Sequence, residues 1–186
     1  MIRKIIKDPR QQQIALFVIK AVLLYIVWFI FYDFHVAQDG FVNTWLNHRV
    51  ATDASYVLDI FGLDGGTIPG NHQTRVMIKG NTMVGVGNPC NGLELFALYA
   101  GFIICFPGNT KSKLWFIPVG FIIIHFINVL RTTALAYIQF KAPEYLDFNH
   151  HYTFTIIVYA IIFLLWITWV NRYSKFNISP EDKRSA

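Results

Sequence analysis

The sequence predicts an all-α integral membrane protein, with about four transmembrane helices and one long loop outside the membrane. Of its 186 residues, 54% are hydrophobic and 17% are aromatic, whereas soluble domains reach about half only when glycine is counted as apolar. The apolar residues also cluster in long runs, and a helix that crosses the hydrocarbon core needs about 20 of them in succession. We therefore interpret residues 1–186 as a single membrane domain.

Four runs are expected to form the transmembrane helices: residues 14–34, 89–106, 114–140 and 153–170. The first is too long for the apolar region of a signal peptide, and no small-x-small cleavage site follows it, so it is expected to remain as an anchor. The second has its apolar part from Leu93 onward and nearly spans the core only if its helix starts at Pro89. Pro89 suits a first helical turn, and Asn88 is expected to cap that turn.

Basic residues beside the helix ends predict the orientation, because cytoplasmic segments carry an excess of lysine and arginine. Four spans place three basic segments on one side: the N-terminal tail, the loop at 109–113 and the C-terminal tail. The protein is therefore expected in the cytoplasmic (inner) membrane, with both termini in the cytoplasm. The segments 35–88 and 141–152 are expected outside. The net charge of +5 follows from this topology and does not indicate nucleic acid.

The segment 35–88 is too long for a simple connection and is expected to cap the outer face of the helices. Residues 41–63 carry apolar side chains at near-helical spacing, which is typical of an amphipathic helix in the membrane interface. The positions concerned are Phe41, Trp45, Val50, Ala54, Leu58 and Phe61. Several glycines and Pro69 then end this helix. Residues 75–87 predict two short strands around Lys79-Gly80-Asn81, which form a hairpin.

This topology brings three reactive side chains to one depth at the outer boundary. Cys90 falls in the expected first turn of the second helix, where free N–H groups and the helix dipole favour a thiolate. Arg131 lies about 26 Å along the third helix from Leu114, and a membrane arginine needs a polar cavity or a partner. His150 and His151 stand just before the fourth run. Cysteine with histidine makes a nucleophile–base pair, and arginine can hold an oxyanion.

Four neighbouring residues are expected to position the substrate or support these groups: Asn91, Gly92, Glu94 and Asn128. Asn128 lies one turn before Arg131 on the same helix face. Gly92 permits the close approach of a backbone or a substrate. Glu94 is expected either to pair with Arg131 or a histidine, or to form a purely structural ion pair.

Two further residues are expected to be structural. Cys105 lies too far from Cys90 along a helix for a disulfide, and it falls near the cytoplasmic end. His125 is in the middle of the third helix and is expected to be satisfied by a neighbour. The two cysteines and the scattered histidines offer no metal-ligand spacing, so neither a metal nor another cofactor is expected.

Three stretches, "NPCNGLELF", "NVLRTTAL" and "NHHYTF" in that order, resemble the exosortase/archaeosortase family of membrane cysteine transpeptidases. The C-x-G signature of that family corresponds to Cys90 with Gly92. Its N-x-x-R motif corresponds to Asn128 with Arg131, and its third site residue to one histidine of "HH". Of the two histidines we prefer His150, because Asn149-His150 can cap the helix start while facing inward.

The resemblance covers about residues 40–170, and the short chain with "HHYTFTIIVY" is most similar to the exosortase F type. The sequence departs from the family pattern at Asn91, where many members have serine or threonine. One helix precedes the shared core here, whereas many members have more.

The resemblance implies a membrane cysteine protease or transpeptidase. Its substrates would be exported proteins whose C-terminal tail has a short motif, a transmembrane helix and a basic cluster. The enzyme would cut beside the motif at the outer leaflet, form a thioester on Cys90 and pass the acyl group to an acceptor. Membrane lipid is the other expected partner, and nucleic acid is not expected.

Two other functions fit the same residues. In a non-catalytic membrane assembly factor, Arg131 and Glu94 would only hold the helices together. A cysteine-dependent acyltransferase would instead act on lipid. A thiol-reactive probe separates the first of these from an enzyme, because a packing cysteine stays inert.

Overall fold

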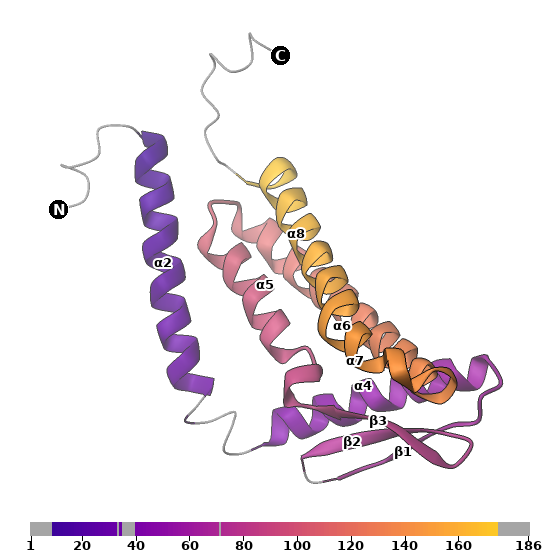
Figure 1. Cartoon of the computed structure of the whole chain (residues 1–186). Helices are drawn as coiled ribbons and strands as arrows, with labels where there is room; N and C mark the ends of the chain where they lie inside the picture. Colours follow the sequence, from indigo (N-terminus) through magenta and orange to yellow (C-terminus); the bar gives the residue numbers. More distant parts are fainter. Residues whose placement is uncertain (1–8, 33, 35–39, 71, 175–186) are drawn as a thin grey trace, which may run out of the picture.

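Four long elements run between two ends of the molecule in the computed structural model, which describes residues 9–32, 34, 40–70 and 72–174. They are α2 (Pro9–Phe31), α5 (Leu93–Cys105), α6 (Thr110–Lys141) and α8 (Phe154–Arg172). Across one end lie α4 (Phe41–Ile60) and a small sheet (Figure 1). We call this the sheet end, and α2 begins and α8 finishes at the opposite end.

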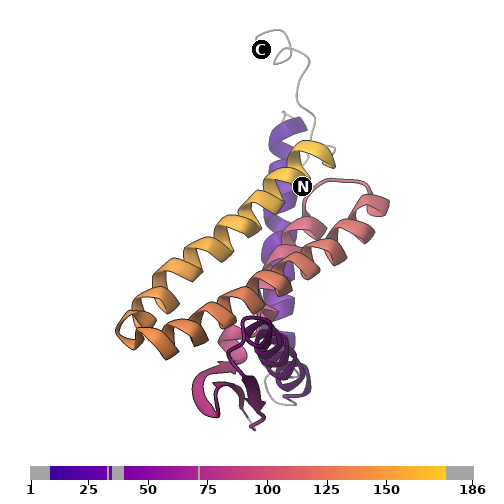
Figure 2. The same ribbon diagram turned by 90° about the vertical axis from the view of Figure 1, so that its right-hand side faces the viewer.

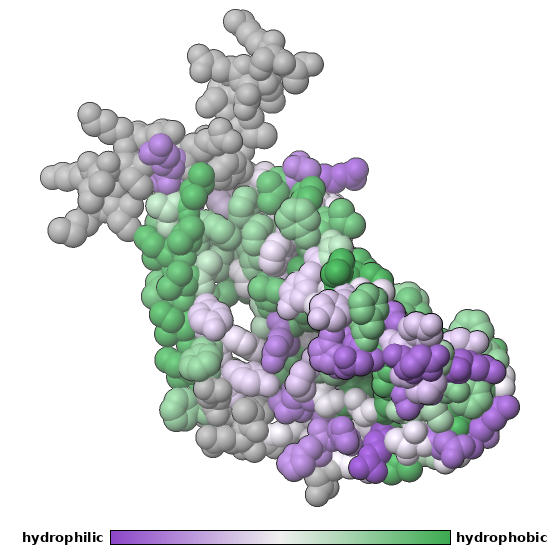
Figure 3. All heavy atoms as spheres, viewed as in Figure 1, coloured by the Kyte–Doolittle hydropathy of each residue, from purple (hydrophilic) through white to green (hydrophobic). Residues whose placement is uncertain are grey.

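The predicted membrane class is confirmed. Three helical segments are long and apolar enough to cross a membrane: Gln11–Phe31, Thr110–Lys141 and Pro143–Arg172. The fourth, α5, is an apolar helix of 13 residues, about 20 Å long. Hydrophobic side chains cover the long helices, and hydrophilic ones gather at the sheet end (Figure 3). This distribution is that of an all-α integral membrane protein with a polar cap.

The start predicted for the second membrane helix is wrong. Asn88–Cys90 forms a separate 3₁₀ turn, and α5 begins only at Leu93. Gly92 lies between the two elements and has a left-handed backbone, with a φ of +89°. Asn88 is part of the 3₁₀ turn and not its cap, and its side-chain oxygen accepts a 3.2 Å hydrogen bond from Asn47 Nδ2 in α4. Cys90 therefore lies before the first turn of α5 and not within it.

Helices α5, α6 and α8 share a continuous apolar core. Its fully buried members include Tyr99, Ile103, Ile162 and Trp169. The Tyr99 hydroxyl donates a 2.8 Å hydrogen bond to the carbonyl of Phe116 in α6, which satisfies this buried hydroxyl. Both α6 and α8 are steeply tilted relative to α2 (Figure 2).

The helix α2 packs mainly on α5. The Phe17 ring lies 5.5 Å from the Phe102 ring and 5.3 Å from the Phe106 ring, measured between centroids. Leu24 closely approaches Gly101, where an added Cβ would lie 3.2 Å from its methyl group. Toward the sheet end α2 and α5 diverge (Figure 1).

The sheet has three antiparallel strands in the order β1-β2-β3. The predicted hairpin is confirmed as β2 (Gln73–Ile78) and β3 (Asn81–Gly87). The strand β1 (Gly65–Ile68) was not predicted, because its two glycines are typical of a helix-ending turn. A Cβ at position 65 would collide with the carbonyl of Ser55 in α4. Glycine here serves the close approach of β1 to α4.

The predicted single apolar face of α4 is wrong in part. Val50, Ala54 and Leu58 are fully buried toward α6 and the sheet, whereas Phe41 is 76% exposed. Trp45 and Phe61 are exposed as well, with Tyr56 and Ile60. The cap formed by α6 and the sheet covers only one side of α4, which leaves a second apolar face free for the membrane interface.

A polar contact joins α4 to α6. His125 Nε2 lies 2.8 Å from Asp53 Oδ2, and Arg49 Nε lies 3.1 Å from the same oxygen. The expectation that a neighbour satisfies His125 is confirmed. The pair fixes where α4 crosses α6, and this crossing positions the loop that follows β3.

Candidate active site

The segment 88–92, between β3 and α5, carries Cys90 and is held by side-chain amides. Asn128 Nδ2 donates a 2.8 Å hydrogen bond to the Cys90 carbonyl. Asn91 Nδ2 donates to Asn43 Oδ1 at 2.8 Å, and Asn91 Oδ1 accepts from the Leu93 N–H at 2.9 Å. Asn91 thus anchors the segment to α4 and satisfies the first backbone N–H of α5 from outside the helix. These bonds fix the backbone on which the thiol stands.

Gly92 lies directly against Asn128. An added Cβ at Gly92 would stand 3.2 Å from Asn128 Nδ2, and Asn128 is 1% exposed. The left-handed backbone and this close approach both require glycine. A backbone or a substrate was expected to approach Gly92, whereas the group that approaches it in the structure is the side-chain amide of Asn128, which holds Cys90.

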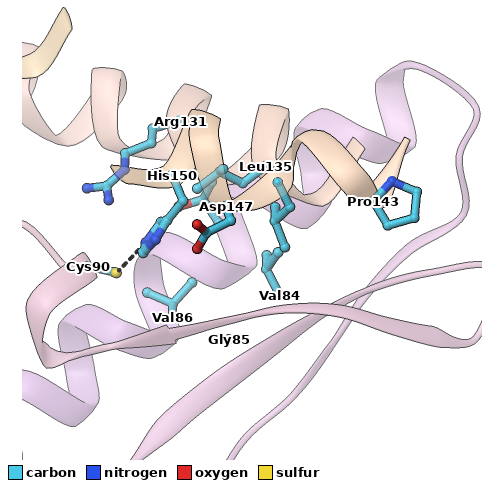
Figure 4. Close-up of a pocket in the computed structure, with 11 residues that line it drawn as sticks. Val84, Gly85, Val86, Cys90, Arg131, Leu135, Pro143, Asp147 and His150 are labelled. Carbon is cyan, nitrogen blue, oxygen red and sulfur yellow. Dashed lines mark hydrogen bonds between the residues drawn. The ribbon is translucent and has the colours of Figure 1, made fainter. Parts of the chain in front are cut away.

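His150 stands beside the thiol. Its Nε2 lies 3.6 Å from Cys90 Sγ (Figure 4). His150 belongs to a π-helical turn, Asn149–Thr153, that joins the short helix α7 (Leu146–Phe148) to α8. His151 is exposed and contacts Asp147, with its Nδ1 3.1 Å from Asp147 Oδ1. Of the two histidines only His150 faces Cys90.

Cys90 and His150 line a cavity of about 280 Å³ together with Arg131 (Figure 4). Its walls come from β3, from α6 and from the turns before α8: Val84, Gly85, Val86, Thr132, Leu135, Pro143, Leu146 and Asp147. Arg131 Nε is buried and has no hydrogen-bond partner within the described part of the chain. An unpaired guanidinium N–H over an otherwise mostly apolar cavity favours an anionic or carbonyl oxygen as its partner.

A family model described as transmembrane exosortase matches residues 11–168. The chain belongs to the transmembrane exosortase family. The match covers most of α2 and α8, the whole of α4, α5, α6 and the sheet, and every residue of the cavity. No curated protein and no solved structure matches the chain significantly. Family membership indicates a membrane transpeptidase-type function in general, and the exosortase F type stays a prediction.

Glu94 of this exosortase does not lie in the Cys90 cavity. Its side chain is exposed in the first turn of α5 and lines a different hollow, between α2 and α5. Neither the expected pair with Arg131 or a histidine nor a structural ion pair forms at Glu94 within residues 9–32, 34, 40–70 and 72–174. Arg131 lines both hollows.

Both cysteines are free thiols; Cys105 is buried, and Cys90 is half-buried. Cys105 ends α5 away from the sheet end, so the two thiols lie at opposite ends of that helix. The expected lack of a disulfide between them is confirmed.

Sequence reasoning missed three residues that support the exosortase site. Asn43 anchors Asn91, and Asn47 Nδ2 donates to Asn88 Oδ1 at 3.2 Å. Both asparagines are buried on α4, four residues apart. Two amides one turn apart on the buried stripe of a helix were the available signal, because buried amides need partners. Asp147, one turn before His150, gave no signal of this kind.

Proposed function

We propose that this exosortase is a cysteine transpeptidase that removes the C-terminal sorting tail of exported proteins and transfers them to an acceptor. The observation that carries the proposal is the 3.6 Å contact between Cys90 Sγ and His150 Nε2, on a cavity that Arg131 also lines. A nucleophile, a base and a donor for an oxyanion are the minimal set for acyl transfer through a thioester.

The first half-reaction makes the thioester. His150 Nε2, unprotonated at the start, accepts the Cys90 thiol proton, and the sulfur attacks the carbonyl carbon of the scissile bond. The carbonyl electron pair moves to oxygen, and the Arg131 guanidinium donates to the resulting oxyanion. When the intermediate collapses, the C–N bond breaks. The amine of the tail leaves with the proton that His150 held.

The second half-reaction releases the product. The amine or hydroxyl of the acceptor gives its proton to His150 and attacks the thioester carbonyl. The C–S bond breaks, and the Cys90 sulfur regains the proton from His150. Water in place of the acceptor would give hydrolysis. Asn128 keeps the Cys90 carbonyl in place through both steps, so that the sulfur stays within reach of His150.

We propose that the sheet end faces outside in the cytoplasmic membrane, with both termini in the cytoplasm. The basic residues Lys111, Lys113 and Arg172 near the opposite ends of the helices support this orientation. Reporter fusions after Arg172 and within 109–113 should report cytoplasm, and fusions at Gly70 should report the outside. External accessibility of the 109–113 loop would reverse the orientation and refute cleavage at the outer leaflet.

The decisive experiment follows a tailed substrate coexpressed with this exosortase. Cys90→Ala should abolish the mobility shift that accompanies loss of the tail, while the protein stays inserted in the membrane. The matched control is Cys105→Ala, which removes the other thiol and should leave processing nearly intact. Normal processing by Cys90→Ala would refute the nucleophile and favour an assembly factor.

The adduct on Cys90 separates peptide transfer from lipid acyl transfer. Hydroxylamine cleaves thioesters, so it should release the substrate polypeptide as a hydroxamate at its new C-terminus. Release of a fatty hydroxamate instead would contradict transpeptidation and support an acyltransferase that acts on lipid. A thiol-reactive probe applied from outside should label Cys90 and leave the buried Cys105 unlabelled.

A further inference from the structure

A second hollow, larger than the Cys90 cavity, lies between α2 and the wall formed by α5 and α8. Its volume is about 710 Å³, and the space-filling view shows the molecule hollowed beside α2 (Figure 3). We call it the α2 groove and define it by Ala21, Leu24, Trp28, Leu98, Val158 and Tyr159, which are among its lining residues. Aromatic and aliphatic side chains dominate its walls.

The α2 groove extends to the sheet end, where Asn88, Pro89 and Gly92 are among its lining residues. The Phe17 contacts with Phe102 and Phe106 hold α2 to α5 at the opposite end, and Leu24 meets Gly101 in the middle. Beyond that point the two helices diverge (Figure 1). The open part of the groove therefore lies beside the segment that carries Cys90.

Two charged side chains line this mainly apolar groove, and both lie near the sheet end. Glu94 is exposed in it without an ion pair among the described residues. Arg131 lines the α2 groove and the Cys90 cavity alike. The two hollows are thus adjacent, with Arg131 at their junction.

We infer that the α2 groove takes the transmembrane helix of the substrate and that Glu94 caps the N-terminal end of that helix. This inference rests on the proposed function, in which the tail helix enters the membrane from the outside with its N-terminus at the sheet end. A helix N-terminus has four unpaired N–H groups and a partial positive charge, which a carboxylate satisfies. Glu94 stands at the depth where that terminus arrives.

The charges favour a peptide helix over an anionic lipid as the occupant. An anionic headgroup that reached Arg131 would be repelled by Glu94, and an acyl chain alone would leave the carboxylate without a partner in an apolar groove. The size also fits part of a helix. A cylinder of about 10 Å diameter and 5.4 Å pitch contains about 420 Å³ per turn, so about 710 Å³ receives somewhat more than one turn.

A positional consequence follows for cleavage. Glu94 holds the first turn of the tail helix, Arg131 lies between the groove and the cavity, and Cys90 lies in the cavity beyond it. The scissile bond must then precede the first turn of the substrate helix by a short and constant spacing. Glu94 is a positioning residue in this scheme, since it acts on the helix and not on the reacting atoms.

Photo-crosslinking tests the docking without requiring catalysis. Both test proteins carry Cys90→Ala. In one, the photoreactive amino acid benzoylphenylalanine replaces Leu98 in the groove; in the other it replaces Ile122 on α6, which is 69% exposed and lies outside the groove. Membranes that contain a tailed substrate should give a substrate adduct from position 98, mapped to the tail helix, and none from 122. A lipid adduct alone, no adduct at 98, or equal adducts at both positions would overturn the docking.

The crosslinking experiment distinguishes a failure of the docking in the α2 groove from a failure of the proposed chemistry at Cys90. Tail removal by the unsubstituted enzyme without an adduct at position 98 refutes the groove and leaves the transpeptidase proposal standing. An adduct at 98 together with normal tail removal by Cys90→Ala refutes the chemistry and supports the docking.

Two substitutions on α2 provide a steric test. Ala21→Trp should fill the groove and reduce processing at least tenfold. The matched control is Leu23→Trp, because Leu23 is 58% exposed and outside the groove on the same helix. Equal processing by the two variants, with insertion intact, would overturn the docking site.

Glu94 is tested through spacing. Glu94→Ala should raise KM by about two- to thirtyfold, the range that loss of a helix cap spans, and Glu94→Gln should lie between it and the natural residue. The natural enzyme should process substrates with one to four residues inserted between the scissile bond and the helix less well than the substrate without an insertion. Glu94→Ala should show a smaller difference between these substrates. Unchanged KM and unchanged discrimination would refute the capping role.

Discussion

Gly92→Ala probes how the loop geometry controls the thiol. The substitution adds one methyl group at a backbone φ of +89°, where the new Cβ would lie 3.2 Å from Asn128 Nδ2. Asn128 cannot yield freely, because it is buried and donates its 2.8 Å hydrogen bond to the Cys90 carbonyl. Either the amide or the loop must shift by a few tenths of an ångström, and either shift moves the sulfur relative to His150.

Two effects of different size follow from this change. A left-handed backbone at a residue with a Cβ costs about 1–2 kcal/mol of stability. Misplacement of a reacting group by about 1 Å costs up to about 100-fold in rate, and a shift of a few tenths should cost about tenfold or somewhat more. Processing of the tail should therefore fall more than the amount of inserted protein does.

The control is Gly80→Ala in the β2–β3 turn, where φ is +75° and no atom lies within 4 Å of an added Cβ. It carries the same backbone strain without the approach to Asn128. The assay compares initial rates of tail removal, normalised to inserted protein, for both variants. Equal rates for Gly92→Ala and Gly80→Ala would refute the reasoning. So would a full additional loss when Gly92→Ala is combined with Asn128→Ala, since coupled neighbours are not additive.

The remaining predictions concern the reactive side chains. Arg131→Lys should lower kcat for tail removal by about 100-fold or more, because lysine loses the planar fork that can hold an oxyanion; a rate near that of the natural enzyme would exclude this role. His150→Ala should lose thioester formation, measured as hydroxylamine-released product, whereas His151→Ala should retain most of it, and the reverse order would contradict the 3.6 Å contact with Cys90. Cys105→Ala should keep processing but lower the free energy of unfolding by about 1 kcal/mol or more, because a buried side chain becomes smaller. Loss of catalysis at unchanged insertion would show that Cys105 acts in the reaction.

Much of the membrane architecture could be predicted from local properties of the sequence. Hydrophobic length located the helices, and the hairpin around Gly80 followed from its strand and turn residues. The rise of 1.5 Å per residue placed Cys90, Arg131 and the histidines at one depth. These inferences need only the chain itself, because span length and helical rise do not depend on which neighbours pack against a helix.

Features that depend on contacts between distant segments could not be predicted in this way. The burial of one side of α4 depends on α6 and the sheet, so the burial of Val50, Ala54 and Leu58 inside the protein was not foreseen. The strand β1 needs Gly65 against α4, although glycine alone indicates a turn. The start of α5 at Leu93 follows from the anchors that Asn91 and Asn128 supply from other elements.

The choice between His150 and His151 shows why tertiary structure was needed at the site. Adjacent helical residues differ by only about 1.5 Å in depth but by about 100° in direction. Both histidines therefore lie at the depth that the sequence determined. They differ in the direction of their side chains, which is set by the rotation of the π-helical turn Asn149–Thr153. That rotation turns His150 toward Cys90 and His151 toward Asp147. It depends on where the segment between α6 and α8 lies in the fold, which the order of the residues within the turn does not determine.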